Sequence, residues 1–180
     1  MLMKDIIKNI SNIILQNNRK LNVALDVNTG EGEWIEIMSD YFNNVIGFEP
    51  FNFNFKTISD KIKDKNNVKI KPWTLGNAND IHIVFYNKET KKYKITYNDN
   101  DRLKTPYRID IKTIEVQKWI QDVDFIRLDT SGYEIETLKG GINVIKRDKP
   151  FLYFNNMNND LLEYLNNINY KQIENNLFYV

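Results

Sequence analysis

Short apolar runs alternate with helix-like patterns along this chain, and this alternation restricts the fold more than any other feature of the sequence. Residues 22–27 are a short apolar run, residues 44–50 and 67–73 have strand-like patterns, and apolar side chains recur at helical spacing over 34–41 and 55–62 between them. Continuous apolar runs are typical of strands buried on both faces, and intervening helices connect parallel strands. The sequence therefore predicts an α/β fold with a doubly wound, mostly parallel sheet.

The later segments continue this pattern. Asn175 and Asn176 favour the turn of a terminal antiparallel hairpin. Residues 88–108 carry seven basic and three acidic side chains with little periodicity, and we expect an irregular basic insert there. We expect one domain over residues 1–180, with further strands at 80–87, 123–129 and 150–155, and further helices at 1–20, 113–120, 134–146 and 158–168.

The composition excludes several classes of protein. The 25 basic and 24 acidic side chains leave a net charge of +1, so no global field attracts nucleic acid or anionic lipid. The chain has no cysteine, which excludes disulfides, thiolate zinc sites and thiol nucleophiles. The N-terminal segment has no uninterrupted apolar run and no small-residue cleavage site. We therefore expect a cytoplasmic protein, of a cell or of a virus-infected host, without a membrane partner.

The first turn of the predicted sheet is the first candidate site, because ligands of doubly wound sheets lie beyond the carboxyl ends of the strands. Residues 26–32 read DVNTGEG, and Gly30 and Gly32 permit close approach of the backbone to a ligand. The acids Glu31 and Glu33 at the start of the next helix would repel a pyrophosphate. This turn therefore suits a cationic or zwitterionic ligand better than a dinucleotide.

A second acid lies at the end of the second predicted strand. Glu49 follows Asp26 by 23 positions and precedes Pro50. A carboxylate at this place can accept hydrogen bonds from both hydroxyls of a ribose. The combination favours S-adenosylmethionine over NAD, with the sulfonium near acids. The alternative is that Glu49 is a solvated acid and that the glycines serve only the turn.

Several segments in the same order resemble the FkbM-type S-adenosylmethionine-dependent methyltransferases. They read LDVNTGEGEW, VIGFEPFNFNFKTI, NVKIKPWTLGN, IKTIEVQKWI, VDFIRLDTSGYEIETLKGGINVI and KPFLYFN, within residues 22–156. The most specific stretch, residues 128–141, is similar to the family's D-V-E-G-x-E-x-x-x-L-K-G-A segment. The resemblance implies one methyltransferase domain with the seven-stranded, Rossmann-like class I sheet and its C-terminal antiparallel hairpin. It also implies O-methylation of a sugar, glycan or other small hydroxylated molecule.

The resemblance assigns roles to individual residues. It implies that the first turn lines the methionine end of the cofactor, that Glu49 holds the ribose, and that residues 74–77 flank the adenine. It also implies that Gly140 lets the helix after the 123–129 strand pack closely, the alternative being a helix broken at Gly140 and Gly141. The expected cofactor-binding residues are Asp26, Asn28, Thr29, Gly30, Gly32, Glu49, Pro50, Thr74, Leu75 and Asn77.

The sequence departs from the family pattern at three positions. Asn28 replaces the first glycine of the turn, Ser131 replaces the glutamate of D-V-E-G, and Asn155 replaces the acid usual at the end of the PFLYF strand. The last two changes remove carboxylates from the acceptor side, so either the acceptor differs or catalysis has weakened. We expect Ser131, Asn155 and Arg108 to contact the acceptor.

Removal of a hydroxyl proton requires a general base. The candidates are Asp129, Glu134 and Tyr133, and Asp129 is favoured because it ends a buried strand. The alternative is a structural acid that caps the following turn. His82 is expected to point outward from its strand. We expect no metal, since a hard cation needs several oxygen ligands and two acids are missing.

Two other functions remain open at this point. One is a nucleic-acid methyltransferase that uses the basic, tyrosine-containing insert as a groove, although a net charge of +1 makes nucleic acid an unlikely partner. The insert could equally pack its aromatic rings against sugars, or be a solvated loop. The other is a catalytically silent cofactor-binding or scaffolding protein. Neither the acceptor nor the oligomeric state follows from the sequence.

Overall fold

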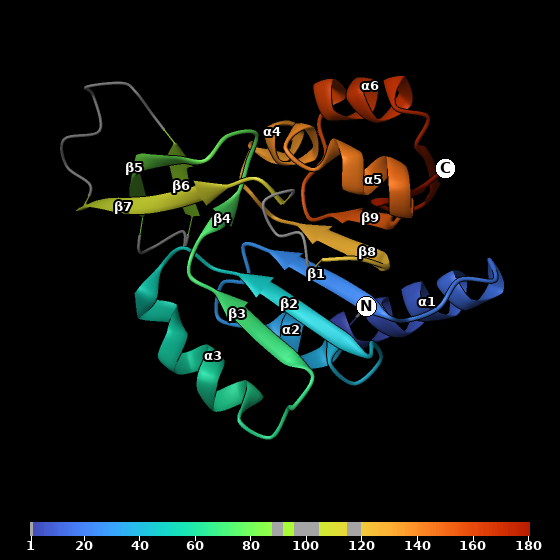
Figure 1. Cartoon of the computed structure of the whole chain (residues 1–180), viewed down its shortest axis with the longest axis horizontal. Helices are drawn as coiled ribbons and strands as arrows, with labels where there is room; N and C mark the ends of the chain where they lie inside the picture. The colour runs from blue at the N-terminus through green and yellow to red at the C-terminus, as the bar shows by residue number, and fades with distance from the viewer. Residues whose placement is uncertain (1, 88–91, 96–104, 115–119) are drawn as a thin grey trace.

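The computed structural model describes residues 2–87, 92–95, 105–114 and 120–180, with only the backbone for 82–87, 92–95 and 105–109. A seven-stranded sheet forms its centre (Figure 1). The strand order is β10-β11-β9-β8-β1-β2-β3, parallel from β3 to β9 and antiparallel on both sides of β11. The strands are β1 (Val23–Val27), β2 (Asn44–Phe48), β3 (Val68–Lys71), β8 (Val123–Leu128), β9 (Phe151–Phe154), β10 (Lys171–Glu174) and β11 (Leu177–Tyr179).

This order confirms the predicted doubly wound sheet and its C-terminal antiparallel hairpin. Leu25 of β1 pairs with Ile46 of β2 on one side and with Ile126 of β8 on the other. All three side chains are buried, as expected for central strands covered on both faces. From β1 the strand order proceeds to β2 and β3 on one side and to β8 and β9 on the other, so the order reverses between β1 and β8. The carboxyl ends of these two parallel strands lie at the same edge of the sheet.

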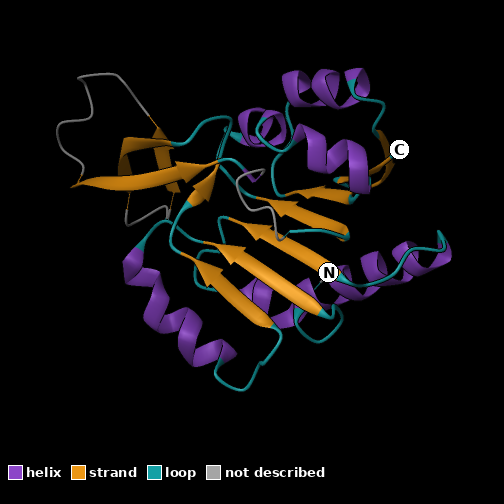
Figure 2. Cartoon of the chain, viewed as in Figure 1, coloured by secondary structure: helices purple, strands orange, loops and turns teal. Residues whose placement is uncertain are grey.

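Helices cover both faces of the sheet (Figure 2). Ile10 and Ile14 of the first helix pack with Phe125 on one face, whereas Leu138 and Leu161 pack with Leu25 on the other. No helix in the described part of the chain has the length and apolar character needed to cross a membrane. The helices are α1 (Met3–Gln16), α2 (Glu33–Met38), η1 (Asn52–Asn54), α3 (Phe55–Ile62), α4 (Glu134–Lys139), α5 (Ile142–Asp148) and α6 (Asn159–Asn167).

A second, four-stranded sheet lies beyond the carboxyl ends of β1, β2 and β3 (Figure 1). Its order is β4-β7-β5-β6, from β4 (Thr74–Leu75), β5 (Asp80–Asn87), β6 (Lys92–Ile95) and β7 (Thr105–Lys112). The predicted strand at 80–87 is confirmed as β5. The predicted irregular insert is wrong where β6 and β7 form, because apolar residues alternate with polar ones in both segments. Residues 115–119 of the predicted helix at 113–120 lie outside the described residues.

The segment after β8 forms two helices where the sequence analysis favoured one. The expectation of a single helix over 134–146 is wrong, because the chain breaks at Gly140 and Gly141 between α4 and α5. The close packing of Gly140 is confirmed, since a Cβ atom there would lie 1.7 Å from the carbonyl oxygen of Gly76. Thr137 adds a hydrogen bond from its Oγ1 to the carbonyl oxygen of Leu75, at 2.9 Å. These contacts fix α4 against the segment that enters the second sheet.

Candidate functional site

The turn between β1 and α2 has a left-handed backbone at three positions. Asn28 has φ 67°, Gly30 φ 62° and Gly32 φ 90°. Asparagine tolerates this conformation better than most residues, which explains how Asn28 replaces a glycine. Its side-chain amide also donates to the carbonyl oxygen of Asp129 at 2.8 Å, a bond that glycine cannot make. Asn28 therefore ties the first turn to the end of β8.

Glu49 lies directly beside this turn with no solvent-exposed surface. Its Oε2 accepts a hydrogen bond from the backbone N–H of Gly30 at 2.7 Å, and its Oε1 accepts one from Phe51 at 2.9 Å. Burial raises the pKa of Glu49 to about 7, against the lowering effect of these N–H donors. A carboxylate has about four acceptor positions. The Asn54 side chain also donates to Glu49, so the carboxylate holds the turn and keeps about one acceptor position for a further donor.

The end of β1 is joined to β8 by a buried ion pair. Asp26 accepts from Arg127 Nη1 at 2.7 Å, and both residues are almost fully buried. Burial raises the pKa of Asp26, while Arg127 opposes this shift. The guanidinium also lies 4.7 Å from the ring centroid of Trp34 in α2. Asp26 thus lies at the predicted strand end, but its carboxylate is bound to Arg127 inside the protein.

Arg127 also connects β8 to β9. Its Nη2 donates to Asp129 Oδ2 at 2.8 Å, and its Nε donates to Asn155 Oδ1 at 3.3 Å. The Asn155 amide in turn donates to Asp129 Oδ2 at 2.7 Å. Sequence analysis did not select Arg127. The sequence contained a signal for this residue, a basic side chain inside an otherwise apolar strand. Arginine is rarely buried without an acidic partner, so this pattern indicates a buried ion pair.

The turn after β8 collects the three predicted general bases. Asp129 has a side chain 27% exposed, Tyr133 is half-buried, and Glu134 is buried. The backbone N–H of Gly132 donates to Glu134 Oε2 at 2.9 Å. Ser131 is exposed, with φ 55°. The structure therefore brings Asp129, Ser131, Tyr133 and Glu134 together with Asn155 at the carboxyl ends of β8 and β9.

Buried polar side-chain atoms without a hydrogen-bond partner gather at the same edge. In the described part of the chain, these atoms belong to the end of β1, to the segment from the end of β3 to the start of β4, and to the segment from the end of β8 to the start of α4. Most buried polar atoms in native proteins are paired, so an exception requires a reason. A polar ligand at this edge supplies one. The atoms are Asp26 Oδ2, Trp73 Nε1, Thr74 Oγ1, Thr130 Oγ1 and Glu134 Oε1.

The remaining predicted residues differ in position. Thr29 is buried and donates from Oγ1 to the carbonyl oxygen of Asp26 at 3.1 Å, while Pro50 is half-buried beside Glu49. Thr74 and Leu75 are buried in β4, and Asn77 is exposed with its amide bonded to Glu136. The side chains of His82 and Arg108 lie outside the described part of the structure, which gives only their backbones in β5 and β7.

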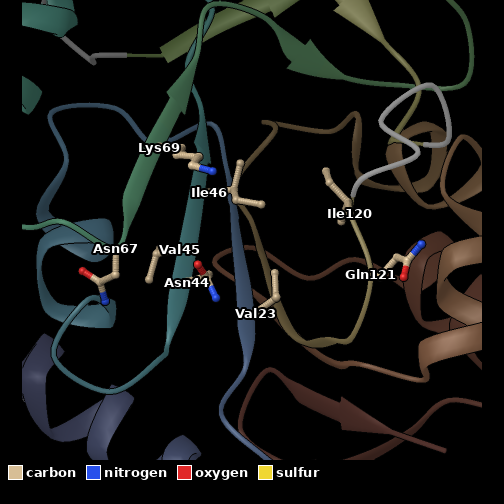
Figure 3. Close-up of a pocket in the computed structure, with 8 residues that line it drawn as sticks. All are labelled: Val23, Asn44, Val45, Ile46, Asn67, Lys69, Ile120 and Gln121. Atoms are coloured by element: carbon tan, nitrogen blue, oxygen red, sulfur yellow. The ribbon is translucent and has the colours of Figure 1, made fainter.

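A cavity of about 210 Å³ lies at the opposite end of the sheet (Figure 3). It adjoins the starts of β1 and β2, so it is separate from the edge that carries Glu49 and Asp129. Sequence analysis gave no indication of it. Its lining residues are Val23, Asn44, Val45, Ile46, Asn67, Lys69, Ile120 and Gln121. Among the described residues, no group of three or more acidic, histidine or cysteine side chains is placed to hold a metal ion.

Comparisons with solved structures support the fold. The precorrin-6y C5,15-methyltransferase of Geobacter metallireducens has a TM-score of 0.51 at 14% identity, over 95% of this chain and 85% of that one. The precorrin 8w decarboxylase of Methanobacterium thermoautotrophicum has a TM-score of 0.51 at 12% identity, over 96% and 83%. An rRNA methylase of Streptococcus thermophilus has a TM-score of 0.50 at 12% identity, over 94% and 91%. At these identities the likeness shows the fold alone. Among curated proteins, none matches.

The family model described as the methyltransferase FkbM domain matches residues 33–172. The match begins just after the turn that contains Gly30 and Gly32, and it includes Glu49 and the whole of β8 and β9. A buried carboxylate just after β2, a left-handed turn beside it and unpaired buried polar atoms at the end of β1 and after the neighbouring strands β3 and β8 fit an adenosine-containing cofactor. The chain therefore belongs to the FkbM family of methyltransferases and uses S-adenosylmethionine as its cofactor.

Proposed function

We propose that this protein is an O-methyltransferase that acts on a hydroxyl of a sugar, a glycan or another small molecule. The observation that carries the proposal is the set of unpaired buried polar atoms at the end of β1, after β3 and after β8. A ligand with several hydrogen-bonding groups would satisfy these atoms, as a nucleoside and a hydroxylated acceptor would together. The family match supports methyl transfer, and the choice of oxygen as acceptor is our proposal.

In this proposal the cofactor lies across the ends of β1, β2 and β3. Glu49 accepts hydrogen bonds from the ribose hydroxyls, and the turn from Asn28 to Gly32 contacts the methionine end. Thr74, Leu75 and Asn77 flank the adenine, where the unpaired Oγ1 of Thr74 is one available polar atom. Asp26 acts indirectly, because its carboxylate is held by Arg127.

The bound cofactor supplies an electrophilic methyl group on a positively charged sulfur. The protein has to hold the acceptor oxygen in line with that group, at about 3 Å, away from water. Asp129 would take the proton from the acceptor hydroxyl as the oxygen–methyl bond forms and the sulfur–methyl bond breaks, with the sulfur leaving as a neutral thioether. Glu134 is the alternative base, because its Oε1 is buried without a partner, and Tyr133 lies in the same turn. Ser131 is exposed beside them and offers a hydroxyl to the acceptor.

The cofactor site is tested by substitution of Glu49. We expect Glu49→Ala to weaken binding of S-adenosylmethionine at least tenfold, since each lost hydrogen bond to a charged acceptor is worth roughly 1.5 to 3 kcal/mol. Titration calorimetry measures the dissociation constant. The matched control is Asp60→Ala, which removes an exposed acid from the neighbouring α3. An unchanged dissociation constant in Glu49→Ala would place the ribose elsewhere.

The acceptor is tested by transfer of labelled methyl from S-adenosylmethionine to a panel of sugars, glycans and small alcohols. Label that appears on oxygen supports the proposal. Tight cofactor binding without transfer to any member of the panel favours the catalytically silent alternative.

An RNA acceptor is the second candidate, because one protein with this fold is named as an rRNA methylase. The net charge of +1 counts against it, since proteins that follow a phosphate backbone usually carry a broad basic surface. Filter binding with RNA at low and moderate salt separates the two acceptors. Binding that falls steeply with salt would favour RNA.

A further inference from the structure

Arg127 lies at the centre of a polar cluster that joins the ends of three adjacent strands. The cluster consists of Asp26 at the end of β1, Arg127 and Asp129 at the end of β8, and Asn155 just after β9. Four hydrogen bonds of 2.7 to 3.3 Å connect these side chains. Two of the residues, Asp129 and Asn155, also belong to the proposed acceptor site. The cluster therefore connects the interior of the sheet to the place where the acceptor would bind.

Arg127 has little freedom to move. Its side chain is only 4% exposed, Asp26 holds Nη1 at 2.7 Å, and the Trp34 ring lies 4.7 Å from the guanidinium carbon. An arginine presents its N–H donors in a rigid planar fork, so fixing one edge also fixes the direction of the others. The Nη2 donor is thereby aimed at Asp129 and the Nε donor at Asn155.

Asn155 fits its place because an amide can donate and accept at once. Its Oδ1 accepts from Arg127, and its Nδ2 donates to Asp129 Oδ2. A carboxylate at position 155 could accept from Arg127 but could not donate to Asp129. It would also bring a third acid next to a single guanidinium. The departure from the family pattern at Asn155 is thus matched to the charges around it and need not signal lost catalysis.

Both donors reach the same oxygen of Asp129. Oδ2 accepts from Arg127 at 2.8 Å and from Asn155 at 2.7 Å, whereas Oδ1 receives no hydrogen bond from the described residues. The side chain of Asp129 is 27% exposed, so the carboxyl group is both held and accessible. A carboxylate fixed by one oxygen presents the other in a defined direction.

We infer that Arg127 and Asn155 are positioning residues, which hold Asp129 by Oδ2 so that Oδ1 faces the acceptor hydroxyl beside the transferable methyl group. This inference rests on the proposed function. It assigns Asn155 a role that requires an amide, and it makes Arg127 part of the acceptor site without contact between Arg127 and the acceptor.

A swap of side chains tests the geometry. We expect Asn155→Asp to lower the folding equilibrium constant about tenfold, because it sets two carboxylates side by side. The double variant Asp129→Asn with Asn155→Asp again places one amide donor beside one carboxylate. We expect it to recover most of the stability that Asn155→Asp loses. The matched control is Asn156→Asp, which adds the same charge at the adjacent exposed position. Urea unfolding measures all four proteins.

Two results of this swap would overturn the inference. One is a loss in Asn155→Asp no larger than that in Asn156→Asp. The other is a double variant that is no more stable than Asn155→Asp alone.

The proposed position of Asp129 beside the transferable methyl group is tested with S-adenosylmethionine that carries ¹³C in that methyl group. We expect the ¹H,¹³C resonance of the bound methyl to move in Asp129→Asn and in Asn155→Asp but not in Asn156→Asp. A purely structural role of the cluster would leave this resonance in place, and an unmoved resonance overturns the inference. If the wild-type protein binds no cofactor, the proposed function itself fails and the placement beside the methyl fails with it. The urea experiment still reports separately on the side-chain geometry.

Discussion

Glu49 joins two segments of the chain through one buried side chain. It has no exposed surface, and its carboxylate accepts hydrogen bonds from the backbone N–H groups of Gly30, in the turn after β1, and of Phe51, after β2. Burial raises its pKa to about 7. Its charge therefore changes near neutral pH, whereas an exposed glutamate is ionised well below that range.

Cofactor affinity should depend on this charge. In the proposed cofactor site, the ionised carboxylate would accept hydrogen bonds from the ribose hydroxyls better than the protonated group would. We therefore expect the affinity for S-adenosylmethionine to fall as pH drops below about 7, by up to tenfold per pH unit. Calorimetry across this range measures the effect, and Glu49→Gln serves as the control because its side chain does not ionise. Parallel pH profiles in the two proteins would contradict the prediction.

The free energy of unfolding should also depend on the ionisation of Glu49, but it should fall as pH rises, whereas the affinity for the cofactor should rise. The folded state holds the proton of Glu49 up to about pH 7, whereas the unfolded chain releases it near the ordinary value of 4.5. The contribution of Glu49 is thus fully present below pH 4.5 and is lost as pH rises through 7. We expect a loss on the order of 3 kcal/mol in the free energy of unfolding, relative to Glu49→Gln. Urea unfolding at several pH values checks this, and a difference between the proteins that stays constant with pH would refute it.

The break between α4 and α5 is a consequence of close packing at the scale of elements. Gly140 allows the end of α4 to rest directly on the backbone of Gly76, since a Cβ atom at Gly140 would lie 1.7 Å from the Gly76 carbonyl oxygen. That contact is to backbone, which cannot rotate away as a side chain can. The junction between the two sheets therefore depends on the absence of a single methyl group.

We expect Gly140→Ala to lower the free energy of unfolding by about 3 kcal/mol, since overpacking of a tight contact costs about 1 to 3 kcal/mol and backbone has to shift here. Lys139→Ala is the control, because that side chain is exposed in the same helical turn. Urea unfolding measures both variants. If the two lose the same stability, the contact with Gly76 is not tight in solution.

Most elements could be predicted from local patterns, and the errors fall where local patterns are ambiguous. The apolar runs of β1, β2, β8 and β9 predicted their strands, because burial on both faces leaves a continuous signal. Strand β3 lies at the edge of the sheet and is only partly buried, and its residues VKIK alternate between apolar and charged. The segment 134–146 was predicted as one helix, since its apolar periodicity continues across Gly140 and Gly141, whereas the structure has two helices with the close contact to Gly76 at the break. Strands β6 and β7 were missed because charged residues obscured their alternation.

The site was predictable where it depends on position along a strand and not where it depends on pairing between strands. Asp26, Glu49 and Asp129 stand at strand ends, and the order of elements alone brings them to one edge. The role of Arg127 required the register that sets it opposite Asp26. From the sequence, Asn155 was interpreted as the replacement of an acid. Its two hydrogen bonds could not be predicted, because their partners lie 26 and 28 positions away along the chain.

The hydrophobic cores on the two faces of the seven-stranded sheet are connected, because the same strands contribute side chains to both. Phe125 packs on the side of α1 and α2, while its neighbour Ile126 packs on the side of α4 to α6. Arg19, which follows α1, is also paired with Asp124 at 3.0 Å. If the helices on one face of the sheet unfolded alone, the shared strands would be exposed to water. The helices on the other face would then lose the ordered sheet against which they pack.

We therefore expect a single cooperative unfolding transition for the full chain. Far-UV circular dichroism and pulse proteolysis in urea should give coincident midpoints, as small single domains usually do. Two separated transitions would show that the second sheet, or one of the two faces, folds independently.

The guanidinium of Arg127 beside the ring of Trp34 has a practical consequence. Indole fluorescence responds to charge near the ring, so the emission of Trp34 reports on whether that cation stays in place. The chain has three tryptophans, and replacing Trp73 and Trp119 by phenylalanine would leave Trp34 as the single emitter. The protein would then carry an intrinsic optical probe of its strand ends, readable during a titration without any attached dye.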